Sequence, residues 1–372
     1  MRIVDMKVYP VAVPCRSDLP YFKTTLETQK TINFIIIELF TDKGITGIGE
    51  APTIDTWSEG QVATAYTLSH ILKDAIVGED PFNIEKINLK MDRVIKGYPI
   101  AKSSIDIALY DIQGKDLGVP VYQLLGGKCR DNVCISRSIG IADLSNTIKW
   151  ARQHVNIGSR TIKLKTGEDP LHDIEAVKAC RKEFGVELNI KIDANQGYQE
   201  SKIAINTIKR MEEFNLYLAE QPVYGWDLDG MAKVTASVDT PIVADESIWG
   251  LEDIQKVIEK NAADVFCIYL SKAGGITKNK KVAHTAESAA IPCILGGMGD
   301  LGVGTAANLH FAISTPNIKY PSDLYIPPTL AVDDIIDKPL EYKGDLAFVP
   351  EDPGLGVKLD YQKIERYGIK LK

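Results

Sequence analysis

Apolar and polar positions alternate, or run apolar for several residues, in the first 50 residues of the chain. Residues 3–14 (IVDMKVYPVAVP) and 32–51 (INFIIIELFTDKGITGIGEA) show this pattern, and the sequence DKG interrupts the second segment. A period of two residues is typical of β-strands, so the pattern predicts antiparallel strands. From about residue 59 to 126 the pattern becomes helical, with a helix stop expected at Gly118 and Pro120. This part of the chain is predicted to be an α+β unit.

After residue 126, short apolar segments alternate with helical patterns. The strand candidates read, in order, VCISRSIG, TIKLKTG, LNIKIDANQG, LYLAEQPV, PIVADESI, VFCIYLSKAGG, IPCILGGMG and, less clearly, IKYPSDLY. Strands that alternate with helices pair in parallel, and about eight such units in a row predict a closed βα barrel. An open, doubly wound sheet is the alternative, although the sequence GxGxxG is missing after an early strand.

The composition narrows the class of protein and of partner. The chain has 372 residues, 45% apolar and 25% charged, which is ordinary for a globular protein of two units or of one barrel with an addition. The formal net charge is −7 without a dense run of Lys or Arg, so neither nucleic acid nor an anionic membrane is an expected partner. No segment approaches the ~20 apolar residues of a membrane span, and the start lacks a signal-peptide core. A cytoplasmic location is expected, with the six scattered cysteines reduced.

Charged side chains stand at the ends of successive predicted strands. Lys163 and Lys165 lie two residues apart and therefore face the same side, while Asp193, Glu220 and Asp245 end the next three strands. Three carboxylates at one mouth of a barrel repel one another, and a hard divalent cation relieves this. The pattern predicts a Mg²⁺ site, with Mn²⁺ as the alternative. A helix cap or a salt bridge would explain one such residue alone, but explains three in register less well.

The lysine pair acquires a chemical role beside such a cation. Two ammonium groups near a dication lower each other's pKa from the usual ~10.4. A neutral Lys165 can then accept a proton. A solvated strand edge is the alternative explanation, but Ile162 and Leu164 indicate that the strand is buried.

Several fragments in order resemble one known family. IKLKTG, IKIDANQG, LAEQP, VADES, SKAGGI and GGMGDLGVGTAANLHFA, together with DIALYDIQGKDLGVPVYQLLGG and DPGLGVKLD, span nearly the whole chain. In this order they resemble the enolase superfamily, and within it the muconate-lactonizing (muconate cycloisomerase) subgroup of the mandelate racemase/muconate lactonizing enzyme family.

The resemblance implies an α/β fold with a modified (β/α)₇β TIM-like barrel and an α+β capping domain built from both termini. The expected division is 1–125 for the capping domain, 126–330 for the barrel and 331–372 for a segment that returns to the cap. The resemblance also implies that the three strand-end carboxylates hold Mg²⁺ and that the shared step removes a proton α to a carboxylate. Lys165 would be the base and Lys163 would stabilise the enediolate. The loops 15–29 and 52–57 would close over the substrate.

The chain departs from this family at the sixth strand. Members of the subgroup carry a catalytic lysine in a pattern like LKxxKxGG, and alignment of the glycine pair places Tyr269 at that lysine and Lys272 at the later one. Asp300 stands where relatives have Glu, and we expect it to pair with Lys272. Dipeptide epimerases show DxD on the eighth strand, whereas this chain has Asp323 followed by Tyr325. The other residues expected around the substrate are Asn195 and Glu246.

Two bases on opposite faces suit a racemase, and Tyr269 is a poorer base than a neutral lysine. The sequence therefore favours one-face chemistry, a lyase (dehydratase) or cycloisomerase reaction on a small carboxylic acid. The alternatives are a racemase or epimerase of an amino-acid derivative or dipeptide that uses Lys165 and Tyr269, and a non-catalytic barrel that binds a carboxylate. A small carboxylate is the expected ligand, and a homo-oligomer is the expected assembly.

Overall fold

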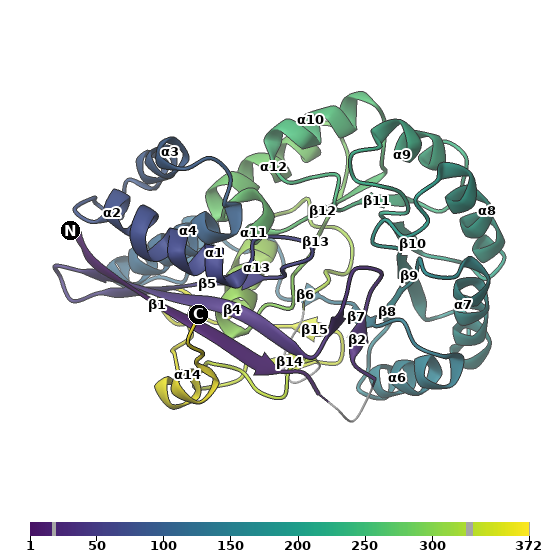
Figure 1. The fold of residues 1–372 in the computed structure, drawn as a ribbon, viewed down its shortest axis with the longest axis horizontal. Helices are drawn as coiled ribbons and strands as arrows, with labels where there is room; N and C mark the ends of the chain where they lie inside the picture. Colours follow the sequence, from purple (N-terminus) through teal and green to yellow (C-terminus); the bar gives the residue numbers. More distant parts are fainter. Residues whose placement is uncertain (17–19, 325–329, 372) are drawn as a thin grey trace.

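The structure is a computed structural model, and it describes residues 1–16, 20–324 and 330–371. An α+β unit built mainly from the N-terminal third lies beside a ring of parallel strands and surrounding helices (Figure 1). In the described part of the chain, no helix combines the length and apolar character needed to cross a bilayer. Tyr325 belongs to the residues outside this description.

The capping unit is an antiparallel sheet covered by helices. Its strands are β1 (Ile3–Pro14), β4 (Thr31–Thr41) and β5 (Thr46–Thr53), in the order β1-β4-β5, as the alternating pattern predicted. A two-stranded hairpin, β2 (Phe22–Lys23) and β3 (Thr28–Gln29), stands between β1 and β4 in the chain. The helical elements of this part are α1 (Gln61–Tyr66), η1 (Thr67–Leu72), α2 (Lys73–Ile76), α3 (Ile84–Val94), α4 (Pro99–Leu117) and α5 (Val121–Leu124).

The barrel strands follow one another in chain order and are all parallel. They are β7 (Arg137–Ile139), β8 (Thr161–Lys165), β9 (Asn189–Asp193), β10 (Leu218–Glu220), β11 (Ile242–Ala244), β12 (Val265–Ile268) and β13 (Cys293–Leu295). The predicted eighth strand is not a regular strand. Its residues Ile318 and Ser322 instead make single parallel bridges to Cys293 and Ile135, and so link the two ends of the sheet.

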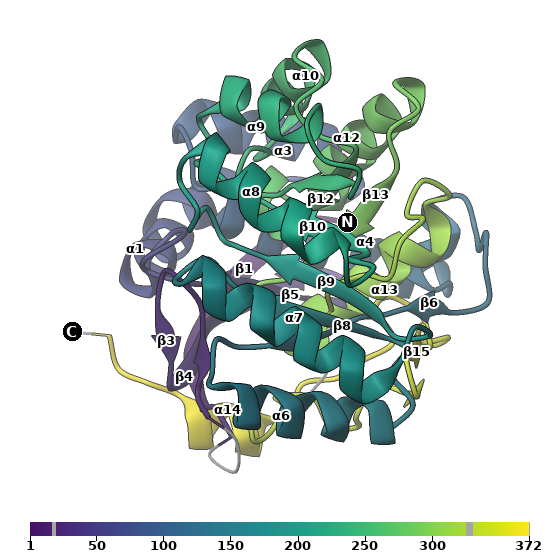
Figure 2. The same ribbon diagram turned by 90° about the vertical axis from the view of Figure 1, so that its right-hand side faces the viewer.

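Helices cover the outside of the sheet (Figure 2). They are α6 (Leu144–Asn156), α7 (Pro170–Phe184), α8 (Ser201–Glu212), α9 (Leu228–Thr235), α10 (Leu251–Glu259), α12 (Ile276–Ser288) and α13 (Gly302–Ser314), with a short turn of helix, α11 (Leu270–Ala273), after β12. Local sequence explains their ends. Helix α7, for example, begins at Pro170 after Asp169, whose side chain accepts hydrogen bonds from two backbone N–H groups, and ends at Gly185 with a positive φ.

Alternation along the strands separates the barrel interior from the helix-facing side. Ala219, Ala244, Phe266 and Ile268 belong to the core cluster that packs against the outer helices. Leu218, Val243, Val265 and Cys267 belong instead to a second cluster that continues into the cap, and Tyr269 lies in it. Residues at the ends of the strands on the interior side therefore face the barrel mouth, as the period of two predicts.

The C-terminal segment returns to earlier parts of the chain. Its strands β14 (Tyr342–Lys343) and β15 (Leu346–Ala347) extend β6 (Val133–Cys134), and its last helix is α14 (Tyr361–Tyr367). Gly368 bridges to Val11 of β1, and α14 lies beside the capping sheet (Figure 1). The fold class expected from the sequence is confirmed, whereas the domain boundaries 125/126 and 330/331 stay predictions.

Candidate active site

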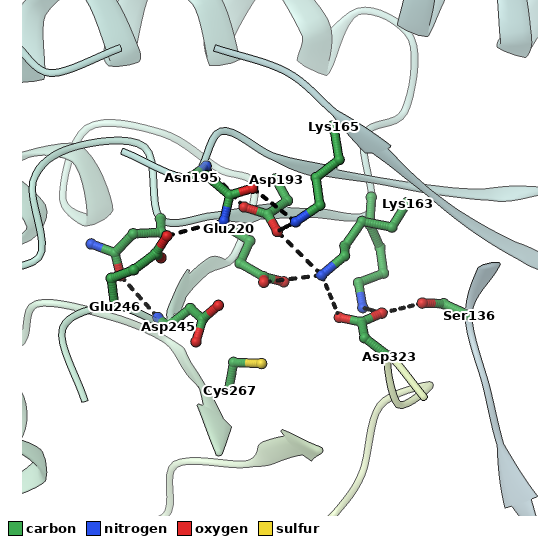
Figure 3. A network of polar contacts seen from close by, with 12 residues as sticks. Ser136, Lys163, Lys165, Asp193, Asn195, Glu220, Asp245, Glu246, Cys267 and Asp323 are labelled. Carbon is green, nitrogen blue, oxygen red and sulfur yellow. Dashed lines mark hydrogen bonds and ion pairs between the residues drawn. The ribbon is translucent and has the colours of Figure 1, made fainter. Parts of the chain in front are cut away.

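Two lysines of β8 lie among carboxylates at the barrel mouth (Figure 3). Lys163 Nζ lies 3.2 Å from Asp193 Oδ2, 3.1 Å from Glu220 Oε1 and 2.9 Å from Asp323 Oδ2. Lys165 Nζ donates hydrogen bonds to Asp193 Oδ2 at 2.5 Å and to Asn195 Oδ1 at 2.8 Å. The spacing of two residues thus places both ammonium groups on the interior side, as the sequence predicted.

Asp323 is contacted by three side chains of this network. Its Oδ1 accepts a hydrogen bond from Lys191 Nζ at 2.7 Å and another from the hydroxyl of Ser136, and its Oδ2 pairs with Lys163. Burial alone would raise the pKa of Asp323, but the ammonium groups of Lys163 and Lys191 bring this pKa to about 2. Asp323 is therefore an anion, and side chains of the protein itself bind both of its carboxylate oxygens. The sequence analysis did not identify Lys191 or Ser136.

Tyr269 stands on the side of the mouth that β12 contributes. Its hydroxyl donates a hydrogen bond to Asp245 Oδ2 at 2.9 Å. Complete burial raises its pKa well above the usual 10, and the negative charge of Asp245 adds to this. β12 ends at Ile268, and Tyr269 is the extended residue before the helical turn α11. The strand within the candidate VFCIYLSKAGG is therefore short, and Tyr269 continues its alternation, on the same side as Val265 and Cys267.

Lys272 is held by Asp245, not by Asp300. Its Nζ donates to the backbone carbonyls of Asp245 at 2.8 Å and Cys267 at 3.1 Å, and it forms an ion pair with the Asp245 carboxylate. It also lies 4.1 Å from the centre of the Tyr269 ring. The predicted pairing of Lys272 with Asp300 is wrong, because the helical turn α11 directs the lysine back under Tyr269. Asp300 Oδ2 instead accepts a hydrogen bond from the backbone of Met298 at 3.2 Å.

Gly296 has no side chain, and the Tyr269 ring occupies the space that a side chain would need. A Cβ atom at Gly296 would lie 2.3 Å from Cε2 and 2.5 Å from Cζ of Tyr269, and 2.8 Å from Cys267 Sγ. Non-bonded atoms do not approach one another this closely. A larger residue at position 296, directly after β13, would therefore displace the ring. The position of Tyr269 is consequently built into the neighbouring strand.

A cavity of about 60 Å³ opens above these residues. Lys165, Asn195, Asp245 and Tyr269 line its inner end, and the capping unit supplies much of the rest. The loops predicted to cover the substrate contribute Phe22, Thr24, Leu26, Glu27, Gln29, Ile54 and Trp57. Residues 17–19 of the first loop lie outside the described residues. The protein thus combines a polar inner end with a largely apolar outer wall, as ligand pockets commonly do.

Asn195 and Glu246 connect Lys165 of the barrel with Trp57 of the capping unit. Asn195 Nδ2 donates to Glu246 Oε1 at 3.0 Å, and the indole N–H of Trp57 donates to the same oxygen at 3.4 Å. Burial raises the pKa of Glu246 to about 8, with a further contribution from the charges of Asp245 and Asp193. The Trp57 ring packs at a tilt of 41° against the ring of Trp249, a residue that the sequence did not point to, with ring centres 5.0 Å apart.

The predicted metal ligands can be tested for their fit to a divalent cation. Asp193 and Glu220 end β9 and β10, Asp245 follows β11, and all three are buried. Glu220 Oε2 has no hydrogen-bond partner in the described structure, and burial followed by the charge of Asp193 raises the pKa of Glu220 well above its usual value. A buried, unpartnered carboxylate oxygen between other carboxylates fits a hard cation.

The side chains of Asp193, Glu220 and Asp245 do not come together in one compact group. In the part of the chain that the structure describes, one group brings potential ligand atoms within 4.8 Å of one another, namely Glu220, Cys267 and Asp323. Asp193 and Asp245 turn toward lysines on either side instead. Burial raises the pKa of the Cys267 thiol well above its usual value, so this group offers a protonated thiol, which is a poor ligand for a hard cation. The assignment of Asp193, Glu220 and Asp245 to Mg²⁺ stays a prediction.

A capped βα barrel whose mouth carries paired lysines and carboxylates defines the molecule as a barrel enzyme. Residues 5–126 match the family described as mandelate racemase / muconate lactonizing enzyme, N-terminal domain, and residues 146–363 match the enolase C-terminal domain-like family. The chain therefore belongs to the mandelate racemase/muconate lactonizing enzyme family of the enolase superfamily.

Similar proteins cover almost the entire chain. N-succinyl-L-Arg/Lys racemase of Bacillus cereus is 33% identical over 98% of this chain and 97% of its own, and its crystal structure matches with a TM-score of 0.95. Muconate cycloisomerase 1 of Pseudomonas putida is 33% identical over 94% of both chains. A dipeptide epimerase from Enterococcus faecalis, crystallised with Mg and the dipeptide L-Leu-L-Tyr, is 32% identical with a TM-score of 0.90, over 96% of this chain and 100% of its own.

Proposed function

We propose that this enzyme removes the proton α to the carboxylate of a small acid with Lys165 as the base, and completes the reaction on the same face of the substrate. β-Elimination of water and cycloisomerisation are reactions of this kind. In the elimination, Lys165 takes the α-proton and becomes an ammonium group, the electron pair forms the new double bond, and the β-hydroxyl group leaves as water with the proton that this ammonium group returns to it. In the cycloisomerisation of an unsaturated diacid, one carboxylate oxygen forms the ring C–O bond, the electron pair of the C=C bond moves into the enediolate of the other carboxylate, and the Lys165 ammonium group protonates the α-carbon. The reverse, ring-opening reaction begins when neutral Lys165 removes that proton.

The environment of Lys165 supports its role as the base. Among the described residues that line the cavity, Lys165 supplies the amine, and Asp193 and Asn195 fix its direction by hydrogen bonds of 2.5 and 2.8 Å. Lys163 lies deeper, where it touches Asp193, Glu220 and Asp323 and can stabilise negative charge that develops on the substrate. The two lysines therefore divide the work between proton transfer and charge stabilisation.

The proposal of one-face chemistry depends on the side chain at position 269. Tyr269 is buried, donates to Asp245 at 2.9 Å and has a pKa raised well above 10, so its phenolate is not available as a base near neutral pH. Lys272, the nearby amine, is bound to Asp245 beneath the ring. A proton can thus be taken by Lys165, whereas the opposite face lacks an amine positioned as a second base in the described site.

The proposal includes a bound divalent cation. Asp193, Glu220 and Asp245 would hold Mg²⁺, for which the unpartnered Glu220 oxygen provides support. When bound, such a cation supplies Lewis-acid stabilisation for negative charge on the substrate carboxylate. The relative crystallised with Mg is consistent with this assignment.

A racemase or epimerase of an N-acyl amino acid or dipeptide is the second candidate. The observation that favours it is the kind of relative: two of the similar proteins described above are a racemase of N-succinyl-Arg/Lys and a dipeptide epimerase. In that reaction the Tyr269 phenol would have to deliver a proton to the face opposite Lys165. The muconate cycloisomerase of equal identity supports the first candidate.

Exchange of the α-proton with solvent tests the proposed base. N-succinyl amino acids, dipeptides, muconate and sugar acids are incubated with the enzyme and Mg²⁺ in D₂O, and ¹H NMR follows the α-proton signal or the product. Lys165→Ala is expected to lower exchange and turnover by about 10²-fold or more, because it removes the proton acceptor. Lys178→Ala, at an exposed lysine of α7, is the matched control and is expected to behave as wild type. Full exchange in folded Lys165→Ala would contradict the assignment.

A further inference from the structure

Buried nitrogen atoms without a hydrogen-bond partner are concentrated at one place outside the reaction centre. They are Nε and Nη1 of Arg137, Nε1 of Trp150 and Nε2 of His154, four of the twelve buried side-chain atoms among the described residues that lack such a partner. The three residues line one small cavity. Because buried polar groups in proteins are normally paired, such a concentration indicates a bound water or ion.

The positions of these residues follow from the local sequence. Arg137 of β7 pairs in parallel register with Ile162 of β8, which belongs to the core cluster on the helix-facing side of the sheet. The period of two therefore directs Arg137 toward the helices. Trp150 and His154 are four residues apart on α6 and so share one face of it. The labels β2, β7 and α6 mark this region in Figure 1.

Arg137 is a buried cation without an ion-pair partner among the described residues. It is only 2% exposed, its Nη2 donates to the Gly344 carbonyl at 3.2 Å, and its guanidinium carbon lies 5.2 Å from the centre of the Tyr342 ring. Asp345 attracts the guanidinium group but forms no ion pair with it. A buried arginine normally has a partner, because removal of its charge from water is costly.

The other groups near Arg137 do not supply the missing negative charge. Burial, followed by the charge of Arg137, lowers the pKa of His154 to about 4, so this histidine is neutral near pH 7. Arg16 adds a second positive charge that acts on His154. None of the described residues that line the cavity carries a carboxylate. The electrostatic environment therefore favours an anion.

The number of hydrogen-bond donors also favours an anion over a water molecule. Nε of Arg137 carries one N–H, Nη1 carries two and the indole of Trp150 carries one, so about four N–H groups lack an acceptor. A water molecule accepts two hydrogen bonds and brings no charge. A spherical anion accepts hydrogen bonds from all sides and neutralises the guanidinium group as well.

The size of the cavity limits the anion to a single atom. Its volume of about 10 Å³ corresponds to one water-sized particle, and a chloride ion is only slightly larger than water. Sulfate, phosphate and carboxylate groups are too large. Phe22, Leu324 and Leu330 supply the apolar part of the lining, where attraction between opposite charges is stronger than in water.

We propose that Arg137 and Trp150 bind one halide ion, chloride under ordinary conditions, in the cavity between β7 and α6. The site goes beyond the proposed function, since Lys165, Asp245 and Tyr269 do not line it. The ion neutralises Arg137 and joins α6 to β7 and, through the contact of Arg137 with Gly344, to the C-terminal segment.

Anomalous diffraction with bromide locates the ion directly. Crystals of the wild-type protein are soaked in sodium bromide, and data are collected at the bromine absorption edge. A bromine peak in contact with Arg137 and Trp150 is expected. A water molecule at this position without an anomalous signal, or the absence of a peak from the cavity, overturns the proposal.

Thermal denaturation measures the same site in solution. Sodium chloride is raised from about 1 to about 200 mM, and sodium gluconate, whose anion is too large for the cavity, keeps the ionic strength constant. The Tm of the wild-type protein is expected to rise by about 2–4 °C with chloride, because the ion binds the folded protein alone. A Tm that does not rise with chloride contradicts the proposal.

Variants at the site identify the residues that hold the ion. Arg137→Met removes the charge and both unpartnered nitrogen atoms, and it should lose the bromine peak and the effect of chloride on Tm. Trp150→Phe keeps an aromatic ring beside Phe22 but removes one donor, and it should weaken chloride binding about fivefold. Arg152→Met, at an exposed arginine of α6 paired with Glu183, is the matched control and should behave as wild type.

The variants also decide the outcome if one of them does not fold. A bromine peak or a chloride effect that persists in folded Arg137→Met overturns the assignment. If Arg137→Met does not fold, an unchanged chloride affinity in Trp150→Phe overturns it, and the expected weakening together with the wild-type bromine peak supports it. None of these measurements uses turnover, so they judge the halide site separately from the proposed function.

Discussion

At the scale of single residues, Tyr269 and Gly296 form one unit. The tyrosine ring occupies the space that a Cβ at position 296 would need, with closest distances of 2.3 and 2.5 Å. Its hydroxyl reaches Asp245, and Lys272 lies beneath its ring. A change at Gly296 therefore acts on the site through the position of the phenol.

Gly296→Ala is expected to destabilise the protein by about 1–3 kcal/mol, the usual cost of overpacking, and to lower turnover by displacing Tyr269. Chemical denaturation measures the free energy of unfolding, and the exchange assay measures turnover. In the background Tyr269→Ala the same glycine substitution should cost clearly less, because the ring is gone and the Cys267 contact alone remains. Equal costs in both backgrounds would show that the ring does not set the requirement for glycine.

Residue-level prediction from sequence succeeded where alternation applied and failed beyond the strand ends. Lys163, Lys165 and Tyr269 point inward as their parity in the strands requires. The same parity places Lys191 beside Asp193 on β9, so a signal for the buried Lys191 was present in the sequence. The partner of Lys272 could not be found in this way, because the lysine follows a helical turn whose direction depends on tertiary packing.

At the scale of elements, helix α13 is tied to two other segments by His310. The Nδ1 atom of this buried histidine accepts a hydrogen bond from the backbone N–H of Tyr122 in α5 at 3.2 Å. Its Nε2–H donates to the carbonyl of Leu355 in the C-terminal segment at 3.1 Å. Burial lowers the pKa of His310 to about 4, outweighing the opposite effects of the Leu355 carbonyl and of Glu351. The neutral imidazole thus joins three segments.

This neutral histidine predicts a loss of stability in acid. Below its usual pKa of 6.5 the unfolded chain binds a proton that the folded protein excludes until about pH 4, so stability falls as the pH falls through this window. His310→Gln removes the contribution of this histidine, and wild type should lose about 3 kcal/mol more than this variant between pH 7 and 4. Urea denaturation at several pH values measures this difference.

An exposed histidine provides the control for this prediction. His70→Gln, on η1, should keep the pH dependence of wild type. If His310→Gln and wild type lose stability in parallel, the histidine is not the group that carries the effect.

The sequence predicted the order of the elements better than it predicted how the barrel closes. Turn residues and hydrophobic periods indicated the antiparallel start and the βα repeats. The segment IKYPSDLY was expected as an eighth strand, but it makes single bridges at Ile318 and Ser322. Such closure depends on the register between the two ends of the sheet, which a local pattern does not contain.

At the scale of the whole molecule, the capping unit and the barrel share the site. The barrel supplies Lys165, Asp245 and Tyr269, and the capping unit supplies Glu27 and Trp57 to the same cavity. Charged strand ends in the sequence were sufficient to place Lys165 and Asp245, whereas Tyr269 was placed by alignment of its glycine pair with the family pattern. The second group came from a resemblance to a family, because nothing in the local pattern shows that residues 22–29 and 54–57 lie over the barrel mouth.

The division of labour between the two sides of this site leads to the central claim, that proton transfer occurs on one face. Family members described as racemases and epimerases are as similar to this chain as a muconate cycloisomerase is. Overall similarity therefore does not choose between them, and the proposal of one-face chemistry rests on the side chain at position 269. A lysine introduced there would supply an amine that the described residues do not place on the opposite face.

The configuration of the product in D₂O tests this claim most directly. Separate L and D enantiomers of an exchanging N-succinyl amino acid are incubated with wild type and with Tyr269→Lys, and NMR and polarimetry follow deuterium content and optical rotation. For wild type we predict that one enantiomer gains deuterium while its rotation persists, whereas Tyr269→Lys causes rotation to decay. Deuterium in product of inverted configuration, formed by wild type at the rate of exchange, would contradict one-face chemistry.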